Sequence, residues 1–311
     1  IELKKFKKKT ALILDNDEEV SYLNLNNKVE KLRKNIKKNS LIFILCNNDL
    51  ETIAMYLACL RNKTICLLIE ENLNLEYLKK LIKIYKPEYI FSDYKKKINN
   101  FKIIFKYRNK TLFKNKEIKK KEYNSKLSVL LTTSGSTGTP KLAKLSYDNL
   151  NFNAISISKY SNISSKDVMV TTLNPAYSFG LSMINSHLLK GAKIILNKYS
   201  IISKNFFEKL SEFKVSTVGG VPFMYEIFDR LKIFEKKNFI NKLLQAGGSL
   251  NIDLQKKFAN ICNKKKIRFF IMYGQTEASP RISYLPPEKF SKKIGSIGIP
   301  IPQGKIEIVD E

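Results

Sequence analysis

The sequence predicts an α/β fold with a mainly parallel sheet and helices on its faces. Short apolar segments alternate with longer segments in which apolar residues recur every three or four positions, and this alternation is typical of strands linked by helices. Leu41–Cys46 is apolar without interruption, as expected of a strand buried on both faces. The 311 residues provide for about two domains and a sizeable core.

The first third of the chain carries three predicted helices. Helical spacing predicts the first over 24–37, Asp49 can cap a second that carries Ile53 and Leu60, and the third is Leu75–Tyr85. The strands predicted between them are 41–46, 64–69 and 89–92.

The alternation continues beyond residue 140. The predicted helices are 146–159, 205–213, 223–231 and 253–263, and the predicted strands are 168–172, 193–196, 215–219, 242–246 and 268–273. Past Gly295, the spacing of glycine and proline and the alternating segment 305–309 predict antiparallel strands. The chain ends at Glu311 with this arrangement incomplete.

The chain is strongly basic, with 56 Lys and Arg against 28 Asp and Glu and a formal net charge of +28. Such an excess suits a polyanionic partner, for example nucleic acid, an anionic membrane, coenzyme A or an acidic carrier protein. Arginine is scarce and lysine is spread along the chain, so we interpret the charge as overall composition and expect no nucleic-acid partner. The lysine clusters of 95–124, around a candidate strand at 102–107, predict a solvated connector; the alternative is a basic binding surface.

The cysteines and the single histidine indicate no covalent or metal chemistry. Cys46, Cys59, Cys66 and Cys262 form no Cys-x-x-Cys pair, which favours buried reduced thiols in a cytoplasmic protein. No apolar segment approaches the roughly 20 residues that cross a bilayer, so no membrane span is expected. His187 lies in an apolar, helix-like segment and is expected to be structural.

A loop of small residues follows the β-prone segment 127–131 and ends in Pro140 and Lys141. Small side chains let backbone N–H groups approach a polyphosphate. Hydroxyl groups add donors, and a threonine oxygen can bind a magnesium ion. Lysine supplies a positive charge to phosphate oxygens. The candidate phosphate-binding residues are Thr133, Ser134, Gly135, Ser136, Thr137, Gly138 and Lys141.

The spacing of this loop fits neither the Walker pattern nor the dinucleotide pattern, because Thr139 follows Gly138 and no Gly-x-Gly is present. Residues 133–141 resemble instead the phosphate loop of adenylate-forming enzymes, which include acyl-CoA synthetases, adenylation domains of peptide synthetases, and luciferases. Their pattern, Thr-Ser-Gly-Ser/Thr-Thr-Gly-x-Pro-Lys, is matched at every specified position. Members usually have glycine after the Pro-Lys pair, where this chain has Leu142.

A second motif, Tyr-Gly-Gln-Thr-Glu at 273–277, follows a predicted strand, and ligands collect at the carboxyl ends of parallel strands. Tyr273 offers a face for a purine ring, Thr276 a hydroxyl for an α-phosphate, and Glu277 a hard oxygen for magnesium. The segment resembles the Tyr-Gly-x-Thr-Glu motif of the same family, which also assigns Gly274 and Gln275 to the nucleotide site.

Two further segments resemble that family. Residues 245–249 follow a predicted strand, and the resemblance implies that Gly247 and Gly248 lie against adenine. Residues 173–181 resemble the substrate-pocket motif, with a tyrosine where histidine is usual. No acid occurs from 173 to 189, so a free α-amino acid is disfavoured, because its buried ammonium would lack a partner. The predicted pocket residues are Tyr177, Phe179, Gly180, Val218 and Gly219, with Gly220 and Pro222 beside them.

The resemblance implies stacked, mainly parallel sheets with flanking helices. It assigns 1–294 to a large N-terminal adenylation domain of two intertwined α/β subdomains, and 295–311 to the start of a small β-barrel subdomain. The C-terminal lid domain of these enzymes has no counterpart in the sequence. The implied reaction uses ATP and Mg²⁺ to form an acyl-adenylate, whose acyl group then passes to the thiol of coenzyme A or phosphopantetheine. Lys141, Thr276 and Glu277 would be catalytic, with Thr137 and Glu277 at the magnesium ion.

Three hypotheses remain open at this point. The first is an AMP-forming ligase that joins a small non-amino carboxylic acid to coenzyme A. The second loads the acyl group onto an acyl carrier protein, and the sequence does not decide between these acceptors. The third, from a different class, is a non-catalytic nucleotide- or acyl-binding module. We also expect residues 1–311 by themselves to adenylate slowly.

Overall fold

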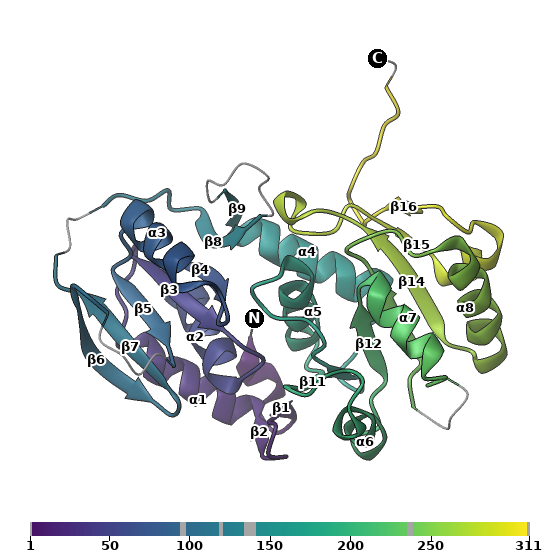
Figure 1. The fold of residues 1–311 in the computed structure, drawn as a ribbon, viewed down its shortest axis with the longest axis horizontal. Helices are drawn as coiled ribbons and strands as arrows, with labels where there is room; N and C mark the ends of the chain where they lie inside the picture. The colour runs from purple at the N-terminus through teal and green to yellow at the C-terminus, as the bar shows by residue number, and fades with distance from the viewer. Residues whose placement is uncertain (1, 94–97, 118–120, 134–140, 235–238, 310–311) are drawn as a thin grey trace.

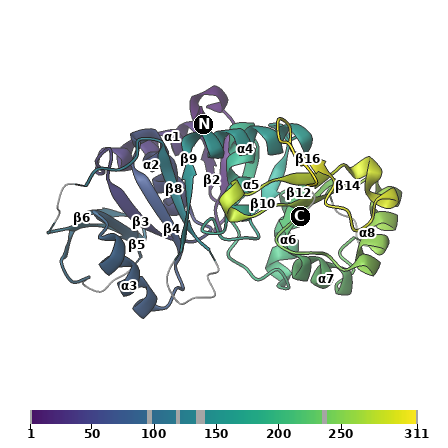
Figure 2. The ribbon, with the colours of Figure 1, turned by 90° about the horizontal axis from the view of Figure 1, so that it is seen from above.

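A computed structural model describes residues 2–93, 98–117, 121–133, 141–234 and 239–309, and the statements below concern these residues. They form two lobes side by side, each built on one sheet (Figure 1). Seen from above, the lobe that carries β3–β9 lies beside the lobe that carries β10–β16 (Figure 2).

The first lobe contains a mixed sheet in the order β6-β7-β5-β3-β4-β8-β9. Its central strands β5, β3, β4 and β8 are parallel, whereas the edge strands pair in antiparallel fashion. The strands are β3 (Leu41–Cys46), β4 (Ile65–Glu70), β5 (Tyr89–Ser92), β6 (Phe101–Tyr107), β7 (Lys110–Asn115), β8 (Leu127–Thr132) and β9 (Leu142–Ser146).

The second lobe contains a sheet in the order β16-β15-β14-β13-β12-β10-β11-β1-β2. The strands from β14 to β1 are parallel, and both edges are antiparallel. The strands are β1 (Thr10–Ile13), β2 (Glu19–Ser21), β10 (Val168–Val170), β11 (Lys193–Ile195), β12 (Thr217–Gly220), β13 (Lys242–Gln245), β14 (Arg268–Tyr273), β15 (Ser283–Leu285) and β16 (Ile299–Pro300). The first two strands of the chain therefore belong to the lobe that the chain completes last.

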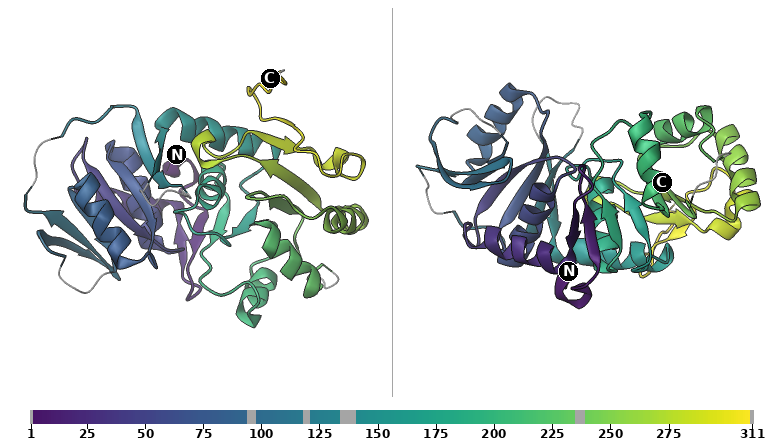
Figure 3. Two further views of the ribbon diagram at one scale, coloured as in Figure 1. Left: turned by 45° about the horizontal axis from the view of Figure 1, so that its top comes forward. Right: turned by 90° about the horizontal axis from the view of Figure 1, so that it is seen from below.

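The helices form three layers around the two sheets (Figures 1 and 3). Helices α1, α2, α4 and α5 lie between the sheets, α3 covers the outer face of the first sheet, and α6, α7 and α8 cover the outer face of the second. Their bounds are α1 (Tyr22–Arg33), α2 (Leu50–Asn62), α3 (Leu75–Tyr85), α4 (Tyr147–Tyr160), α5 (Ser178–Leu189), α6 (Lys204–Glu212), α7 (Pro222–Arg230) and α8 (Ile252–Lys265). Three 3-10 turns complete the fold: η1 (Leu3–Phe6), η2 (Thr276–Ala278) and η3 (Pro287–Lys292).

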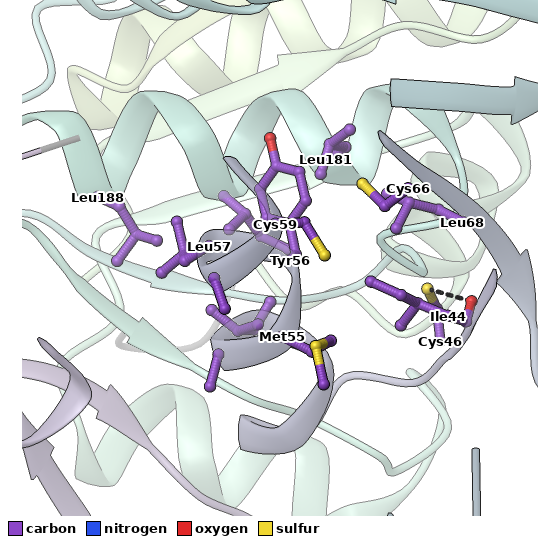
Figure 4. Packing of buried hydrophobic residues seen from close by; sticks show 14 of the residues in the cluster. Ile44, Cys46, Met55, Tyr56, Leu57, Cys59, Cys66, Leu68, Leu181 and Leu188 are labelled. Atoms are coloured by element: carbon purple, nitrogen blue, oxygen red, sulfur yellow. Dashed lines mark hydrogen bonds between the residues drawn. The ribbon is translucent and has the colours of Figure 1, made fainter. Parts of the chain in front are cut away.

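The central core joins the lobes. Figure 4 shows Tyr56 of α2 beside Cys66 of β4 and Leu181 of α5, so that side chains from both lobes meet in one apolar cluster. All four cysteines are buried and free, as predicted. Removing apolar surface from water contributes about 25 cal/mol of stability per Å². The burial of this shared cluster therefore fixes the two sheets relative to each other.

The helix starts follow from local capping chemistry. Asp49 accepts a hydrogen bond from the Thr52 backbone N–H at 2.7 Å and begins α2 as predicted. Ser21 caps α1 through the Asn24 N–H at 3.1 Å, so this helix begins two residues earlier than predicted, and it ends at Arg33 rather than Lys37.

Two parts of the chain differ from their predictions. The expected connector at 95–124 contains β6, which matches the candidate strand at 102–107, and β7, which was not predicted; the two strands extend the first sheet through β5. Lysines in β6 and β7 obscure the alternation of apolar residues. The expected strand at 305–309 is absent: these residues run away from the second lobe (Figure 1), and Ile308 is 98% exposed. An apolar alternation forms a strand only when a neighbouring strand pairs with it.

Candidate functional site

The loop of small residues leaves and re-enters the first sheet at one point. The Thr133 backbone N–H donates a hydrogen bond to the Lys141 carbonyl at 3.2 Å, and Leu142 pairs with Thr132 as β9 begins. The residue that replaces the family's usual glycine therefore starts a strand. Ser134, Gly135, Ser136, Thr137 and Gly138, which the sequence assigns to phosphate binding, lie outside the described residues.

The second motif lies at the carboxyl end of β14. Tyr273 ends the strand and is 45% exposed, and Thr276 and Glu277 form the turn η2. A Cβ atom on Gly274 would lie 1.7 Å from the Pro280 carbonyl oxygen, so only glycine fits this turn. Gln275 precedes η2 and is exposed. The Glu277 carboxylate is exposed and makes no hydrogen bond or ion pair with a described residue, so it is accessible to a ligand.

The two motifs come together although they belong to different sheets. Residues of β9, which starts directly after Lys141, lie within 8 Å of residues of η2, measured between Cα atoms. The ammonium group of Lys141 is exposed. The fold therefore brings β9, the strand that follows the loop, next to the turn that carries Thr276 and Glu277.

We call the place where β9 meets η2 the junction. A serine that the sequence analysis did not select also contributes to it. Ser178 is the first residue of α5, and its hydroxyl oxygen lies 3.1 Å from that of Thr276. Ser178 is buried, whereas Thr276 is partly exposed. Ser178 directly follows Tyr177 inside the predicted pocket motif, and this position in the sequence could have indicated it. The contact orients the Thr276 hydroxyl, which is the group expected to meet an α-phosphate.

The glycine pair after β13 adjoins the same helix start. Gln245 donates a hydrogen bond from Nε2 to the Gly248 carbonyl at 2.9 Å and holds the turn. Gly247 has φ +81°, and a Cβ atom there would lie 2.5 Å from the Tyr177 hydroxyl oxygen. Bare backbone is therefore required where the turn meets Tyr177. Both glycines are exposed, which leaves their backbone accessible to a flat ligand.

The predicted pocket residues are only partly brought together. The rings of Tyr177 and Phe179 meet edge to face at 6.5 Å. A Cβ atom on Gly180 would lie 2.4 Å from the Asn174 carbonyl oxygen, and one on Gly219 would lie 3.0 Å from Cε of Met183 in α5. Gly219 therefore faces α5. The Val218 side chain lies on the other face of β12. There it packs in the apolar cluster beneath α7 and α8, on the outer face of the second sheet.

His187 is buried within α5, in keeping with the structural role expected of it. Its Nδ1 lies 2.7 Å from the Met183 carbonyl oxygen, and Nε2 has no partner among the described residues. Burial lowers the pKa of His187 to about 4. The side chain is therefore neutral near pH 7 and has no access to a ligand.

A lysine-lined cavity of about 1000 Å³ lies far from this junction. It opens at the amino ends of β3 and β5, where Ser40 and Tyr89 lie, whereas both motifs follow the carboxyl ends of strands. Its lysines are Lys37, Lys38, Lys102, Lys114, Lys116 and Lys121. The positive charge of the cavity therefore does not belong to the candidate site.

Two other kinds of feature, a cluster of metal ligands and a membrane-spanning helix, are not found among the described residues. No three His, Cys, Asp or Glu side chains gather closely enough to hold a metal ion on their own. No helix in the same residues is long and apolar enough to cross a bilayer. A metal at this site would therefore need ligands from a bound nucleotide beside Glu277.

Several curated proteins are similar to this chain. The 2-succinylbenzoate–CoA ligase of Listeria monocytogenes is 24% identical over 310 residues, which are 98% of this chain and 65% of that protein. A feruloyl-CoA synthase of an Amycolatopsis species is 28% identical over 176 residues, which are 55% of this chain and 35% of that protein. The chain therefore spans between about one third and two thirds of the length of these relatives.

Solved structures share the fold. A double mutant of o-succinylbenzoate CoA synthetase from Bacillus subtilis, bound to a product analogue, has a TM-score of 0.78 at 20% identity and covers 96% of this chain and 63% of that one. VinN has a TM-score of 0.79 at 19% identity, with 99% and 81% covered. The α/β fold expected from the resemblance is thus confirmed. The model of the AMP-binding enzyme family matches residues 2–311, and the chain belongs to that family.

Proposed function

We propose that the intact protein activates a carboxylic acid with ATP and transfers the acyl group to a thiol. The observation that carries this proposal is the meeting of β9 and η2, which brings the strand that follows the loop next to the turn that carries Thr276 and Glu277. A carboxylate oxygen of the substrate attacks the α-phosphorus, pyrophosphate leaves, and an acyl-adenylate forms. A thiolate then attacks the acyl carbon, and AMP leaves.

Each residue near the junction has a defined task in this scheme. Lys141 and the loop 133–138 hold the β- and γ-phosphates, and their charge and N–H groups stabilise the pentavalent transition state. The Thr276 hydroxyl, oriented by Ser178, donates to the α-phosphate. Tyr273 and the backbone of Gly247 and Gly248 bind adenine, the tyrosine with its exposed ring.

A magnesium ion fits the donor set of the described residues. Glu277 is an exposed carboxylate without a partner among the described residues, and magnesium is commonly held by one or two carboxylates together with substrate phosphates. When bound, the ion would neutralise phosphate charge. Thr137, proposed as a further ligand, lies outside the described residues.

The proposed acceptor is coenzyme A. The names of the similar proteins, feruloyl-CoA synthase and 2-succinylbenzoate–CoA ligase, support this choice over a carrier protein. We further propose that residues 1–294 are the large adenylation domain of the protein and that 295–311 begin a β subdomain. A carrier-bound phosphopantetheine thiol would react by the same chemistry and is therefore an alternative acceptor in the test.

Carboxylate-dependent exchange between ATP and pyrophosphate tests the proposal on the intact protein. A panel of carboxylic acids is expected to contain at least one that supports exchange. The variant Lys141→Ala is expected to lower the exchange rate about 10- to 100-fold, because hydrogen bonds to charged groups contribute about 1.5–3 kcal/mol. Lys144→Ala removes an exposed lysine from the neighbouring strand and serves as the matched control.

Two results would contradict the proposal: no acid supports exchange, or Lys141→Ala behaves as Lys144→Ala does. ATP binding without exchange under any acid would favour a non-catalytic binding module. Coenzyme A and a carrier protein are then offered separately to the acid that exchanges fastest, and thioester formation identifies the acceptor.

A further inference from the structure

A buried arginine without an acidic partner lies behind the junction. Arg281 is 3% exposed, and its guanidinium carbon lies 4.2 Å from the centre of the Phe179 ring. No ion pair joins it to a carboxylate among the described residues, and its Nε and Nη2 have no hydrogen-bond partner. A buried charge in this condition costs several kcal/mol unless a ligand compensates it.

The neighbours of Arg281 do not neutralise it. Burial lowers the pKa of Arg281, and the hydroxyl groups of Tyr160 and Tyr177 oppose that effect. Burial also raises the pKa of Tyr160 to about 12, so this phenol stays neutral. The Tyr160 ring is itself fixed, stacked on Tyr284 at 4.1 Å. The guanidinium therefore lies among aromatic rings, and the Tyr160 hydroxyl that is hydrogen-bonded to it is neutral.

The two unpartnered nitrogens define which ligand would fit. Nε and Nη2 donate from the same edge of the planar guanidinium, and this edge binds a carboxylate through two parallel hydrogen bonds. A single hydroxyl or carbonyl oxygen would satisfy only one of the two. The free edge of Arg281 is thus matched to a planar anion with two oxygens.

Arg281 also lies beside residues of the predicted substrate pocket. Phe179, whose ring it covers, directly follows Ser178, and Ser178 contacts Thr276. The main chain of Arg281 is held by the side chain of Asn153 in α4, which donates to its carbonyl at 3.3 Å. The cation is therefore fixed beside the two aromatic residues of the predicted substrate pocket, Tyr177 and Phe179.

Resting on the proposed function, we propose that Arg281 is a specificity-determining residue that selects dicarboxylic acids. One carboxylate is activated at Thr276, and the second binds the free edge of Arg281. A purely structural cation, held by the Phe179 ring alone, predicts that substitutions change stability and leave substrate preference unaltered.

Matched pairs of acids separate these two roles. Pyrophosphate exchange is measured on the intact protein with hexanoate against adipate and with benzoate against terephthalate. The wild type is expected to prefer the diacid of at least one pair by about tenfold or more, because paired hydrogen bonds to a charged group are strong. Arg281→Met is expected to lose that preference, because its exchange rate with the diacid alone should fall about 10- to 100-fold. Arg230→Gln, on the exposed end of α7, is the control and should keep the preference.

Every outcome decides the inference. Equal use of monoacids and diacids by the wild type, or an unchanged ratio in Arg281→Met, overturns it and leaves the proposed function intact. Absence of exchange with all acids overturns both. If Arg281→Met does not fold, Arg281→Lys, which keeps the charge and loses the planar fork, decides instead: the diacid preference must fall while the melting temperature and the monoacid rate stay near those of the wild type.

Discussion

The hydroxyl oxygens of Ser178 and Thr276 lie 3.1 Å apart and connect the start of α5 to the turn after β14. These two elements belong to one lobe, and β9 of the other lobe lies against the same turn. The turn that carries Thr276 is therefore contacted both by a side chain of α5 and by a strand of the other lobe.

The first prediction concerns this pair of hydroxyls. Thr276→Val removes a donor to a charged phosphate and is expected to lower the exchange rate about 10- to 100-fold. Ser178→Ala removes only the neutral hydrogen bond that orients Thr276, so a loss of about 2- to 10-fold is expected. Thr276→Ser keeps the donor and should retain most of the rate. The order of the three variants in steady-state exchange checks the assignment; an equal effect of Ser178→Ala and Thr276→Val contradicts it.

The second prediction concerns the contact between Gly247 and Tyr177. Gly247→Ala places a Cβ atom 2.5 Å from the Tyr177 hydroxyl at a residue with φ +81°, so AMP binding measured by calorimetry should weaken and the melting temperature should fall. The double variant Gly247→Ala/Tyr177→Phe removes the atom that clashes and should recover part of the loss. The rest is expected to persist, because the left-handed conformation costs about 1–2 kcal/mol for alanine. Failure of the second substitution to improve the first would exclude this contact as the cause.

The third prediction concerns the pH dependence of stability. Burial lowers the pKa of His187 to about 4 in the folded chain, against about 6.5 for an exposed histidine. Its contribution is therefore fully present above about pH 6.5 and is lost as the pH falls toward 4, because the unfolded state binds the proton first. The loss from this residue is expected to be roughly 1–2 kcal/mol at pH 5.5. Urea unfolding at pH 7.5 and pH 5.5 measures it, and His187→Gln, in a chain with no other histidine, should flatten the difference by this amount.

The fourth prediction concerns the buried ion pair between Lys242 of β13 and Asp167, which directly precedes β10. Lys242 is fully buried, and its ammonium lies 2.9 Å from Asp167, which also accepts from the Ser164 backbone N–H. Asp167→Ala leaves that ammonium without its counter-ion and is expected to cost about 3–5 kcal/mol of unfolding free energy. Adding Lys242→Met should restore part of this loss. Asp253→Ala breaks an exposed pair with Lys256 and, as the control, should cost less than about 1 kcal/mol in the same denaturation assay.

Much of the fold follows from local patterns. Leu41–Cys46, Leu75–Tyr85 and Arg268–Tyr273 have the predicted bounds, because each has a clear apolar run or helical apolar periodicity between capping or turn residues. Strands β1 and β2 were not predicted: β1 is short and is defined by its distant partner β11. β7 was missed for a similar reason, since its lysines resemble those of a solvated loop, although Lys110 is in fact buried beside Glu71. Patterns that depend on a distant partner leave little trace in the sequence.

The candidate site likewise contains residues that motifs predict and residues whose role depends on tertiary packing. Motif spacing predicted Lys141, Thr276 and Glu277 as site residues, and the fold brings β9, which follows Lys141, next to η2. The pocket motif contained Ser178 but did not single it out, and no motif pointed to Arg281, because the contacts of both residues depend on how α5 packs beside β14. The direction of the Val218 side chain follows from the register of β12, which the apolar composition of that strand does not reveal.

The position of β1 bears on how the chain folds during its synthesis. Leu12 cannot pair with Ile194 until the ribosome has completed nearly two thirds of these residues. The first lobe, whose strands are contiguous in the chain, can assemble meanwhile, while the apolar strand β1 keeps one edge without its parallel partner. A nascent chain stalled before residue 193 should therefore expose β1 to holdase chaperones, and release beyond β11 should end that association.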